Sequence, residues 1–182
     1  PESIRAGRFI DAPLAHPAVT FRRLEVIAAG GYRDGDFPED HELWLRLFEC
    51  GALFGRVEET LVDWTDRPER FTRTNPRCRD EARRDLVHTY LASGPLADGK
   101  RARIWGAGPF GKRHARDLHR RFGCVDDLID IDPKKIGREV AGGLTVVSHE
   151  SLGAPDGRLI LLAVGSAGAR EQIEAFLLER GH

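Results

Sequence analysis

The spacing of apolar residues divides the sequence into two halves of different character. In the first half, apolar positions recur at helical spacing over residues 23–29, 38–50 and 79–91. The helix over 38–50 has the clearest pattern, with an apolar stripe formed by Leu43, Trp44, Leu47 and Phe48. Residues 53–64 are apolar enough to supply one or two strands. This half is therefore predicted to be mostly helical.

The second half follows a linker over residues 93–100 and alternates short apolar runs with helical patterns. The expected strands cover residues 102–105, 128–131, 144–147 and 159–164. The expected helices cover 109–122, facing inward through Phe110, Ala115, Leu118 and Phe122, and 168–180. Such alternation is typical of parallel βαβ units. We predict an α/β chain: a mostly helical domain over 1–92, then a Rossmann-like parallel sheet with flanking helices over 101–182.

A glycine turn over residues 106–111 joins the first expected strand of this sheet to a helix. Its G-x-G-x-x-G spacing permits a tight turn, leaves room for a phosphate and lets helix and strand pack closely. An acid about twenty residues further on would bind a ribose. The candidate nucleotide-binding residues are Gly106, Gly108, Phe110, Gly111, Asp130, Asp132 and Gly165. The alternative is that the turn serves packing alone.

Other features of this half exclude two kinds of site. The segment from Gly106 also fits the glycines and lysine of a P-loop, but Arg113 stands where that loop needs Ser or Thr. Asp130 and Asp132 spell D-x-D, a metal motif of many glycosyltransferases, yet they lie at the end of an expected Rossmann strand. We therefore predict neither a P-loop nor a metal here.

Composition narrows the classes of partner and compartment. The net charge of −1 gives no overall attraction to nucleic acid or anionic lipid. The three cysteines lie far apart without C-x-x-C pairing, and the histidines show no ligand spacing, so neither a disulfide framework nor a zinc site is expected. No apolar run is long enough to cross a bilayer. A cytoplasmic protein without a transmembrane segment is predicted.

The first turn of the helix over 38–50 carries the candidate chemistry of the first half. Glu39 and Asp40 place two carboxylates at the start of a helix anchored by Leu43 and Trp44. Such a carboxylate can take a proton from an attacking hydroxyl. Acids in a first turn also simply complement the helix dipole, which is the plainer interpretation.

This stretch resembles the E-D-x-x-L-W segment near the C-terminal end of the catalytic domain in GT-A glycosyltransferases of family 2. The resemblance extends through residues 16–23, 30–32 and 61–64 and covers roughly residues 10 to 80. It implies an inverting transferase that moves a sugar from a nucleotide diphosphate donor to an acceptor hydroxyl. It implies further that Asp40 is the general base and that Glu39 lies near the acceptor.

The resemblance also implies partners and cofactors. The donor would be a nucleotide sugar, and the acceptor a glycan, a lipid-linked molecule or a small molecule. Four residues could contact the diphosphate or the acceptor: Arg67, Arg70, Arg73 and Trp64. A solvated loop with a packed tryptophan explains them equally well. In the family a divalent metal, Mg or Mn, is held by a D-x-D in the N-terminal half, which does not precede Pro1 here, so this piece alone is expected to be inactive.

The second half is similar to NAD-binding domains and to the nucleotide-sugar-binding domains of sugar acyltransferases. Both use the glycine turn, here followed by the segment from Ile129 to Gly137. NAD and a nucleotide sugar are therefore the candidate ligands. The competing function is an NAD(P)-dependent oxidoreductase whose first half is a helical addition, but nothing after Gly165 supplies catalytic groups for hydride transfer.

Overall fold

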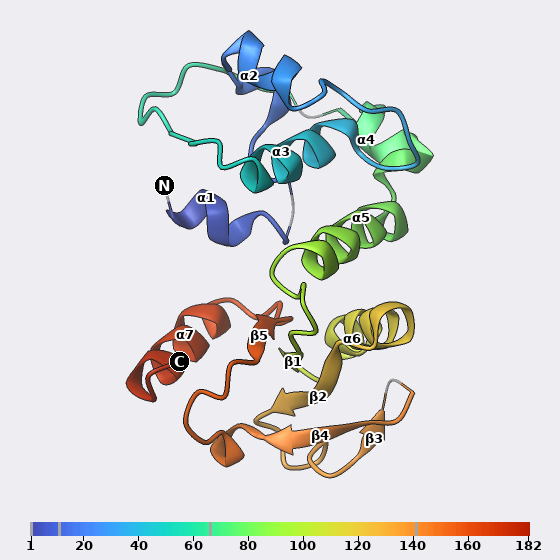
Figure 1. Cartoon of the computed structure of the whole chain (residues 1–182), viewed down its shortest axis with the longest axis vertical. Coiled ribbons are helices and arrows are strands. Elements are labelled where there is room, and N and C mark those ends of the chain that lie inside the picture. The colour runs from blue at the N-terminus through green and yellow to red at the C-terminus, as the bar shows by residue number, and fades with distance from the viewer. Residues whose placement is uncertain (1, 11, 66, 141) are drawn as a thin grey trace. The chain divides into compact units, whose positions relative to one another are not determined.

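The computed structural model describes every residue except 1, 11, 66 and 141, and the chain divides into two compact units. The N-terminal unit comprises residues 1–94 and the C-terminal unit residues 95–182 (Figure 1). The secondary-structure elements described in the N-terminal unit are all helical, and the C-terminal unit contains a five-stranded sheet. The chain is thus mixed α/β with a Rossmann-like second half, which confirms the predicted fold class.

The helices of the N-terminal unit include the three that were predicted. Its elements are α1 (Glu2–Gly7), the 3-10 turn η1 (His16–Ala18), α2 (Arg23–Ala28), α3 (Glu39–Glu49), α4 (Phe71–Thr74), the 3-10 turn η2 (Pro76–Cys78) and α5 (Asp80–Ser93). Helices α2, α3 and α5 lie where the apolar spacing placed them. The short elements α1 and α4 were not predicted, because their sequences contain too few apolar residues to show a helical period.

The prediction of strands over residues 53–64 was wrong. This described segment is irregular and carries exposed apolar side chains, among them Leu53, which is 99% exposed. A strand needs a partner to satisfy its backbone hydrogen bonds. No described residue of the N-terminal unit supplies one.

The core of the N-terminal unit is built on α3. Leu43, Trp44 and Leu47 pack with Val26 of α2, and Leu14, Val19, Ala29, Ala52 and Phe54 lie against this cluster. Helix α2 meets this cluster through Val26, which is buried, while Leu24 on the same helix is 76% exposed. A helix of six residues presents about one turn to its neighbour, so a single residue decides which side is buried.

A buried ion pair ties α3 to its surroundings. Glu42 accepts hydrogen bonds from Arg46 Nε at 2.9 Å and Nη2 at 2.8 Å, and from the Tyr90 hydroxyl of α5 at 2.6 Å. Arg46 also donates to the Ala29 and Gly31 carbonyl oxygens just after α2. One network therefore fixes α3 against α5 and the loop that follows α2.

The C-terminal unit contains β1 (Ala102–Trp105), α6 (Pro109–Phe122), β2 (Val125–Asp130), β3 (Glu139–Val140), β4 (Leu144–Ser148), the 3-10 turn η3 (His149–Ser151), β5 (Leu159–Leu162) and α7 (Ala169–Glu179). The strand order is β3-β4-β2-β1-β5. Strands β4, β2, β1 and β5 are parallel, and only β3 runs antiparallel, to β4. The predicted parallel sheet is confirmed, with β3 as an unpredicted edge strand.

The second strand begins earlier than expected, at Val125 rather than Leu128. The acidic pair Asp126 and Asp127 interrupts the apolar run, but Asp127 lies beside Arg103 of β1, which donates to it at 2.8 Å. Asp126 likewise accepts from Arg101. Cross-strand ion pairs thus take the place of apolar contacts at this end of β2.

The two long helices of this unit lie on opposite sides of β1 (Figure 1). Helix α6 has the predicted bounds and buries Gly111, Ala115 and Leu118. The inward orientation predicted for Phe110 and Phe122 was wrong, since these side chains are 56% and 38% exposed. Helix α7 buries Ile173 in a cluster with Trp105 and Ile129.

Candidate functional site

The first turn of α3 holds Asp40 in a defined orientation. Pro38 precedes the helix with a φ of −64°, which suits a helix start, and Glu39 and Asp40 complement the positive end of the dipole. The Asp40 carboxylate accepts a hydrogen bond from the His41 backbone N–H at 2.8 Å. One carboxylate oxygen is therefore held by the helix, and the other is available to a ligand.

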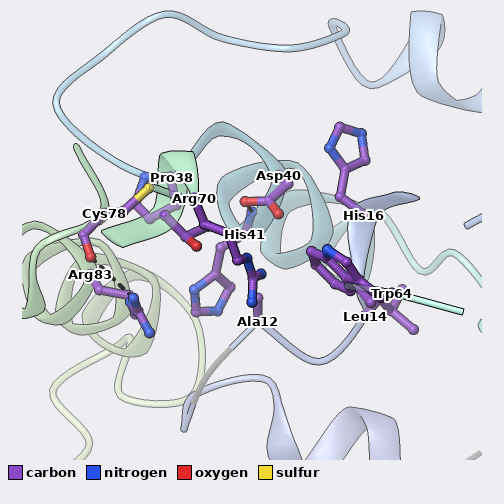
Figure 2. Close-up of a pocket in the computed structure, with 12 residues that line it drawn as sticks. Ala12, Leu14, His16, Pro38, Asp40, His41, Trp64, Arg70, Cys78 and Arg83 are labelled. Carbon is purple, nitrogen blue, oxygen red and sulfur yellow. Dashed lines mark hydrogen bonds between the residues drawn. The ribbon is translucent and has the colours of Figure 1, made fainter. Parts of the chain in front are cut away.

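Asp40 lines a cavity of about 300 Å³ in the N-terminal unit (Figure 2). The cavity is formed by segments that are far apart in the sequence. Its polar and aromatic lining includes His16, Asp40, His41, Trp64, Arg70, Cys78 and Arg83. Two arginines, an aromatic ring and one carboxylate suit a ligand that carries both a sugar ring and negative charge.

Trp64 and Arg70 meet at this cavity. The guanidinium carbon of Arg70 lies 4.2 Å from the centre of the Trp64 ring, a cation–π contact. Trp64 is half exposed, so its ring is accessible to a ligand. The structure thus brings together three of the sequence-predicted residues, Asp40, Trp64 and Arg70.

Three other predicted residues are not among the described residues that line the cavity. Glu39 lies on the same turn as Asp40 but outside the lining, and Arg67 and Arg73 lie on the exposed segment around α4. Arg73 donates to the Arg67 carbonyl oxygen at 3.5 Å. This contact helps to shape the chain around Arg70.

Sequence reasoning missed several of the cavity residues, among them His16, Cys78 and Arg83. His16 Nε2 shares a hydrogen bond with the Tyr32 hydroxyl at 2.8 Å, and Arg83 donates to the Cys78 carbonyl oxygen at 3.0 Å. Burial raises the pKa of the Cys78 thiol, and the nearby charges of Glu39 and Asp40 raise it further. His16 lies within the stretch that carries the family resemblance, whereas no local pattern marks Cys78 or Arg83.

In the C-terminal unit, the glycine turn has two structural glycines and one that faces open space. Gly106 has a φ of +118°, and a Cβ there would lie 2.5 Å from the Ala163 carbonyl oxygen. A Cβ on Gly111 would collide with the Gly106 carbonyl oxygen, whereas one on Gly108 would meet no heavy atom within 4 Å. The space beside Gly108 is where the glycine pattern expects a phosphate.

Asp130 holds this turn in place. Its carboxylate accepts hydrogen bonds from the backbone N–H groups of Ala107 at 2.7 Å and Asp132 at 2.9 Å, and from Lys135 Nζ at 3.0 Å. Burial opposes ionisation of this carboxyl, but the three donors outweigh it and hold its pKa below the ordinary value. Both oxygens of Asp130 are thus engaged within the protein.

The remaining predicted residues of the turn lie near its surface. Asp132 accepts from the Lys134 backbone N–H at 2.9 Å and is half-buried. Gly165 is exposed just after β5, and the Phe110 ring lies against His114 with ring centres 4.3 Å apart. Asp132 is therefore more accessible to a ribose than Asp130.

Replacing Gly111 with alanine is expected to destabilise the C-terminal unit by about 1–3 kcal/mol, because the added methyl group cannot fit beside the Gly106 carbonyl oxygen. Denaturant titration of the full chain measures this loss. Gly108→Ala is the matched control, since its methyl group enters open space. Equal losses for the two variants would contradict the packing role of Gly111.

Two kinds of feature are not found in the described part of the chain. No group of three or more His, Cys, Asp or Glu side chains there could hold a metal ion. No helix among the described residues is long and apolar enough to cross a membrane.

Comparison with known proteins relates part of the chain to sugar transfer. No family model matches it. Over 52 residues it is 36% identical to the UDP-Gal:alpha-D-GlcNAc-diphosphoundecaprenol beta-1,3-galactosyltransferase of Escherichia coli, a match that covers 29% of this chain and 19% of that protein. Over 50 residues it is 36% identical to the amylovoran biosynthesis glycosyltransferase AmsE of Erwinia amylovora, covering 28% and 19%. The matches span about one fifth of the length of these relatives, and over that stretch the chain is related to glycosyltransferases.

Proposed function

We propose that the N-terminal unit is the C-terminal part of the catalytic domain of an inverting GT-A glycosyltransferase of family 2. The observation that carries this proposal is Asp40, an oriented carboxylate in a cavity shared with Trp64 and Arg70. The similarity to two glycosyltransferases supports it. The linker near residue 94 then joins this part to an accessory Rossmann-like domain.

In this proposal Asp40 acts as the general base. The acceptor hydroxyl loses its proton to the free oxygen of Asp40 while the acceptor oxygen bonds to the anomeric carbon of the donor sugar. The bond from that carbon to the diphosphate breaks on the opposite face, so the configuration inverts and the nucleoside diphosphate leaves. The hydrogen bond from the His41 N–H keeps the carboxylate aimed at the acceptor.

Trp64 and Arg70 would bind the substrates beside this base. The half-exposed Trp64 ring offers a flat apolar surface to a sugar. Arg70, held over that ring, supplies positive charge to a diphosphate. Arg83 adds a second guanidinium to the same cavity.

A divalent metal is expected in the family, but the described residues of this chain do not fit one, because they offer no cluster of three ligands. The proposed role of this chain therefore uses only Asp40 and the cavity residues. Since the matches cover about one fifth of each relative, we expect the isolated chain not to transfer sugar.

The donor and acceptor classes follow from the relatives. One of them is named for UDP-Gal as donor and for an acceptor linked to diphosphoundecaprenol. We propose a nucleotide diphosphate sugar as donor here and a glycan carried on a lipid diphosphate as acceptor. The positive lining of the cavity suits the charge of such substrates.

The experiment that tests this function is a transfer assay with the full-length enzyme that carries this chain. It is incubated with UDP-sugars and polyprenyl-diphosphate-linked acceptors, and the products are read by mass spectrometry. An acceptor heavier by one sugar is expected. Folded enzyme that transfers none of the sugars tested to any of these acceptors would overturn the proposal.

Replacing Arg70 with alanine in that enzyme is expected to lower kcat/KM for transfer about tenfold, through loss of one charged contact to the substrate. Steady-state kinetics with varied donor and acceptor measure the change. Arg56→Ala is the matched control, because Arg56 is exposed and outside the cavity lining. Equal kinetics for the two variants would remove Arg70 from the substrate site.

For the C-terminal unit we propose nucleotide binding at the glycine turn, supported by the open space at Gly108. Calorimetry of the chain with NAD, UDP and UDP-galactose distinguishes the candidate ligands. Heat with NAD alone would favour the competing oxidoreductase interpretation. No heat with any of them would leave the turn a purely structural role.

A further inference from the structure

Helix α6 presents a row of arginines away from the sheet. Arg113, Arg116 and Arg120 are exposed, whereas Ala115 and Leu118 are buried on the opposite side of the helix. The three arginines are spaced by three and four residues, so they lie along one line of the helix surface. At 1.5 Å per residue, the row is about 10 Å long.

This row opposes the stability of its own helix. Like charges three or four residues apart repel each other. Lys112, the residue before Arg113, lies in the first turn of α6, where the helix dipole disfavours positive charge. Asp117 is the only acidic residue in the sequence of α6. An external anionic surface would relieve this repulsion.

Other arginines of the C-terminal unit are neutralised within the protein. Arg103 pairs with Asp127 at 2.8 Å, and Arg101 and Arg158 pair with Asp126. Within the described part of the chain, the structure shows no such ion pair for Arg113, Arg116 or Arg120. The charges of Arg113, Arg116 and Arg120 therefore face the solvent.

We propose that the exposed face of α6 docks on the anionic headgroups of a phospholipid bilayer. The inference rests on the proposed function, because an acceptor carried on a lipid diphosphate lies at a membrane. The overall charge of −1 provides no attraction to such a surface, so the local row must supply it. The partly exposed ring of Phe110, one turn before Arg113, adds an apolar contact suited to the headgroup region.

A nucleic acid is the competing anionic partner, and two features favour the bilayer. The row is short for a nucleic-acid site, where positive charge follows the phosphates over a larger surface. The exposed Phe110 ring suits the headgroup region of a bilayer, where aromatic side chains are common. Binding to a duplex is therefore an outcome that the experiment must separate.

The test is co-sedimentation of the full chain with vesicles of phosphatidylcholine, with or without about one third phosphatidylglycerol. Binding is expected only to the anionic vesicles and should weaken as salt is added. Replacing Arg113, Arg116 and Arg120 together with glutamine should lower the partition coefficient on the order of a hundredfold, at about fivefold for each arginine near the surface. Glutamine preserves helix propensity, and circular dichroism verifies the fold.

The matched control replaces Arg23, Arg56 and Arg79 with glutamine, which changes the net charge equally at exposed positions outside α6. It should retain anionic-vesicle binding within about threefold. If the triple α6 variant does not fold, Arg116→Gln alone should still weaken binding about fivefold. Equal binding by parent and folded α6 variants, or no binding to anionic vesicles, would overturn the proposal.

The second part of the experiment measures binding of the chain to a labelled DNA duplex. Tighter binding to the duplex than to the anionic vesicles would assign the surface to nucleic acid and overturn the membrane proposal. Vesicle binding is measured without sugar transfer, so its failure is distinguishable from failure of the proposed function. Vesicle binding by an enzyme that transfers no sugar would count against the function alone.

Discussion

Replacing Arg46 with alanine is expected to lower the free energy of unfolding of the N-terminal unit by about 3–5 kcal/mol. Arg46 forms an ion pair with Glu42, and both side chains are almost completely buried. Removing the guanidinium leaves the Glu42 carboxylate without its main partner and leaves the carbonyl oxygens of Ala29 and Gly31 without their donor. The cost is large because the unpaired charge stays in a region of low polarity.

Denaturant titration of the full chain, followed by tryptophan fluorescence, measures this loss. Hydrogen exchange assigns it to α3 and α5, which the network joins. Arg22→Ala is the matched control, because Arg22 and Glu25 form an exposed ion pair at 3.5 Å. That control should change the free energy of unfolding by less than about 0.5 kcal/mol. A comparable loss for both variants would mean that the Glu42–Arg46 pair does not stabilise the unit.

The stabilisation by the Glu42–Arg46 pair is expected to decrease at acidic pH. Burial disfavours ionisation of Glu42, but the hydrogen bonds from Arg46 and Tyr90 outweigh it and hold the pKa of Glu42 below its ordinary value. The stabilisation by ionised Glu42 is therefore complete above the ordinary pKa and is lost as the pH falls through the folded-state pKa. The difference in stability between parent and Arg46→Ala should shrink over that acidic range.

The elements that sequence analysis located best are those whose apolar pattern is local. Strand β1 and helix α6 have the predicted bounds. The apolar run of β1 and the apolar stripe of α6 both arise from burial in the same sheet domain, so the pattern begins and ends with the element. Residues 53–64 have an apolar pattern too, but no partner strand, and their structure is irregular. A strand depends on a distant segment, and a pattern within twelve residues cannot reveal whether that segment exists.

The residues of the candidate site were likewise predictable only where a local sequence pattern marks them. Asp40 could be singled out because it lies in the first turn of a helix with a strong apolar stripe, within the stretch that resembles the E-D-x-x-L-W segment. Cys78 and Arg83 enter its cavity from η2 and α5, about forty residues away, and nothing in their local sequence indicates it. Asp130 and Asp132 were the two candidates for binding a ribose, and the local sequence does not indicate that the Asp130 carboxylate also accepts a hydrogen bond from the Ala107 N–H of the turn.

Replacing Asp40 with asparagine is expected to lower sugar transfer by the full-length enzyme about 10²–10⁴-fold, the usual contribution of a general base. Asparagine retains an oxygen that can accept the His41 N–H, so the first turn of α3 should keep its shape. It cannot take up the acceptor proton. The expected loss is therefore in kcat, with thermal stability unchanged.

Asp36→Asn is the matched control, because Asp36 is exposed, lies four residues earlier and is outside the cavity lining. It makes the same chemical change at a site without a proposed role. The role of Asp40 is tested most directly by the kcat of transfer from a nucleotide diphosphate sugar, measured side by side for these two folded variants. We predict transfer near the parent level for Asp36→Asn and almost none for Asp40→Asn; parent-level transfer by Asp40→Asn would contradict the assignment of Asp40 as the catalytic base.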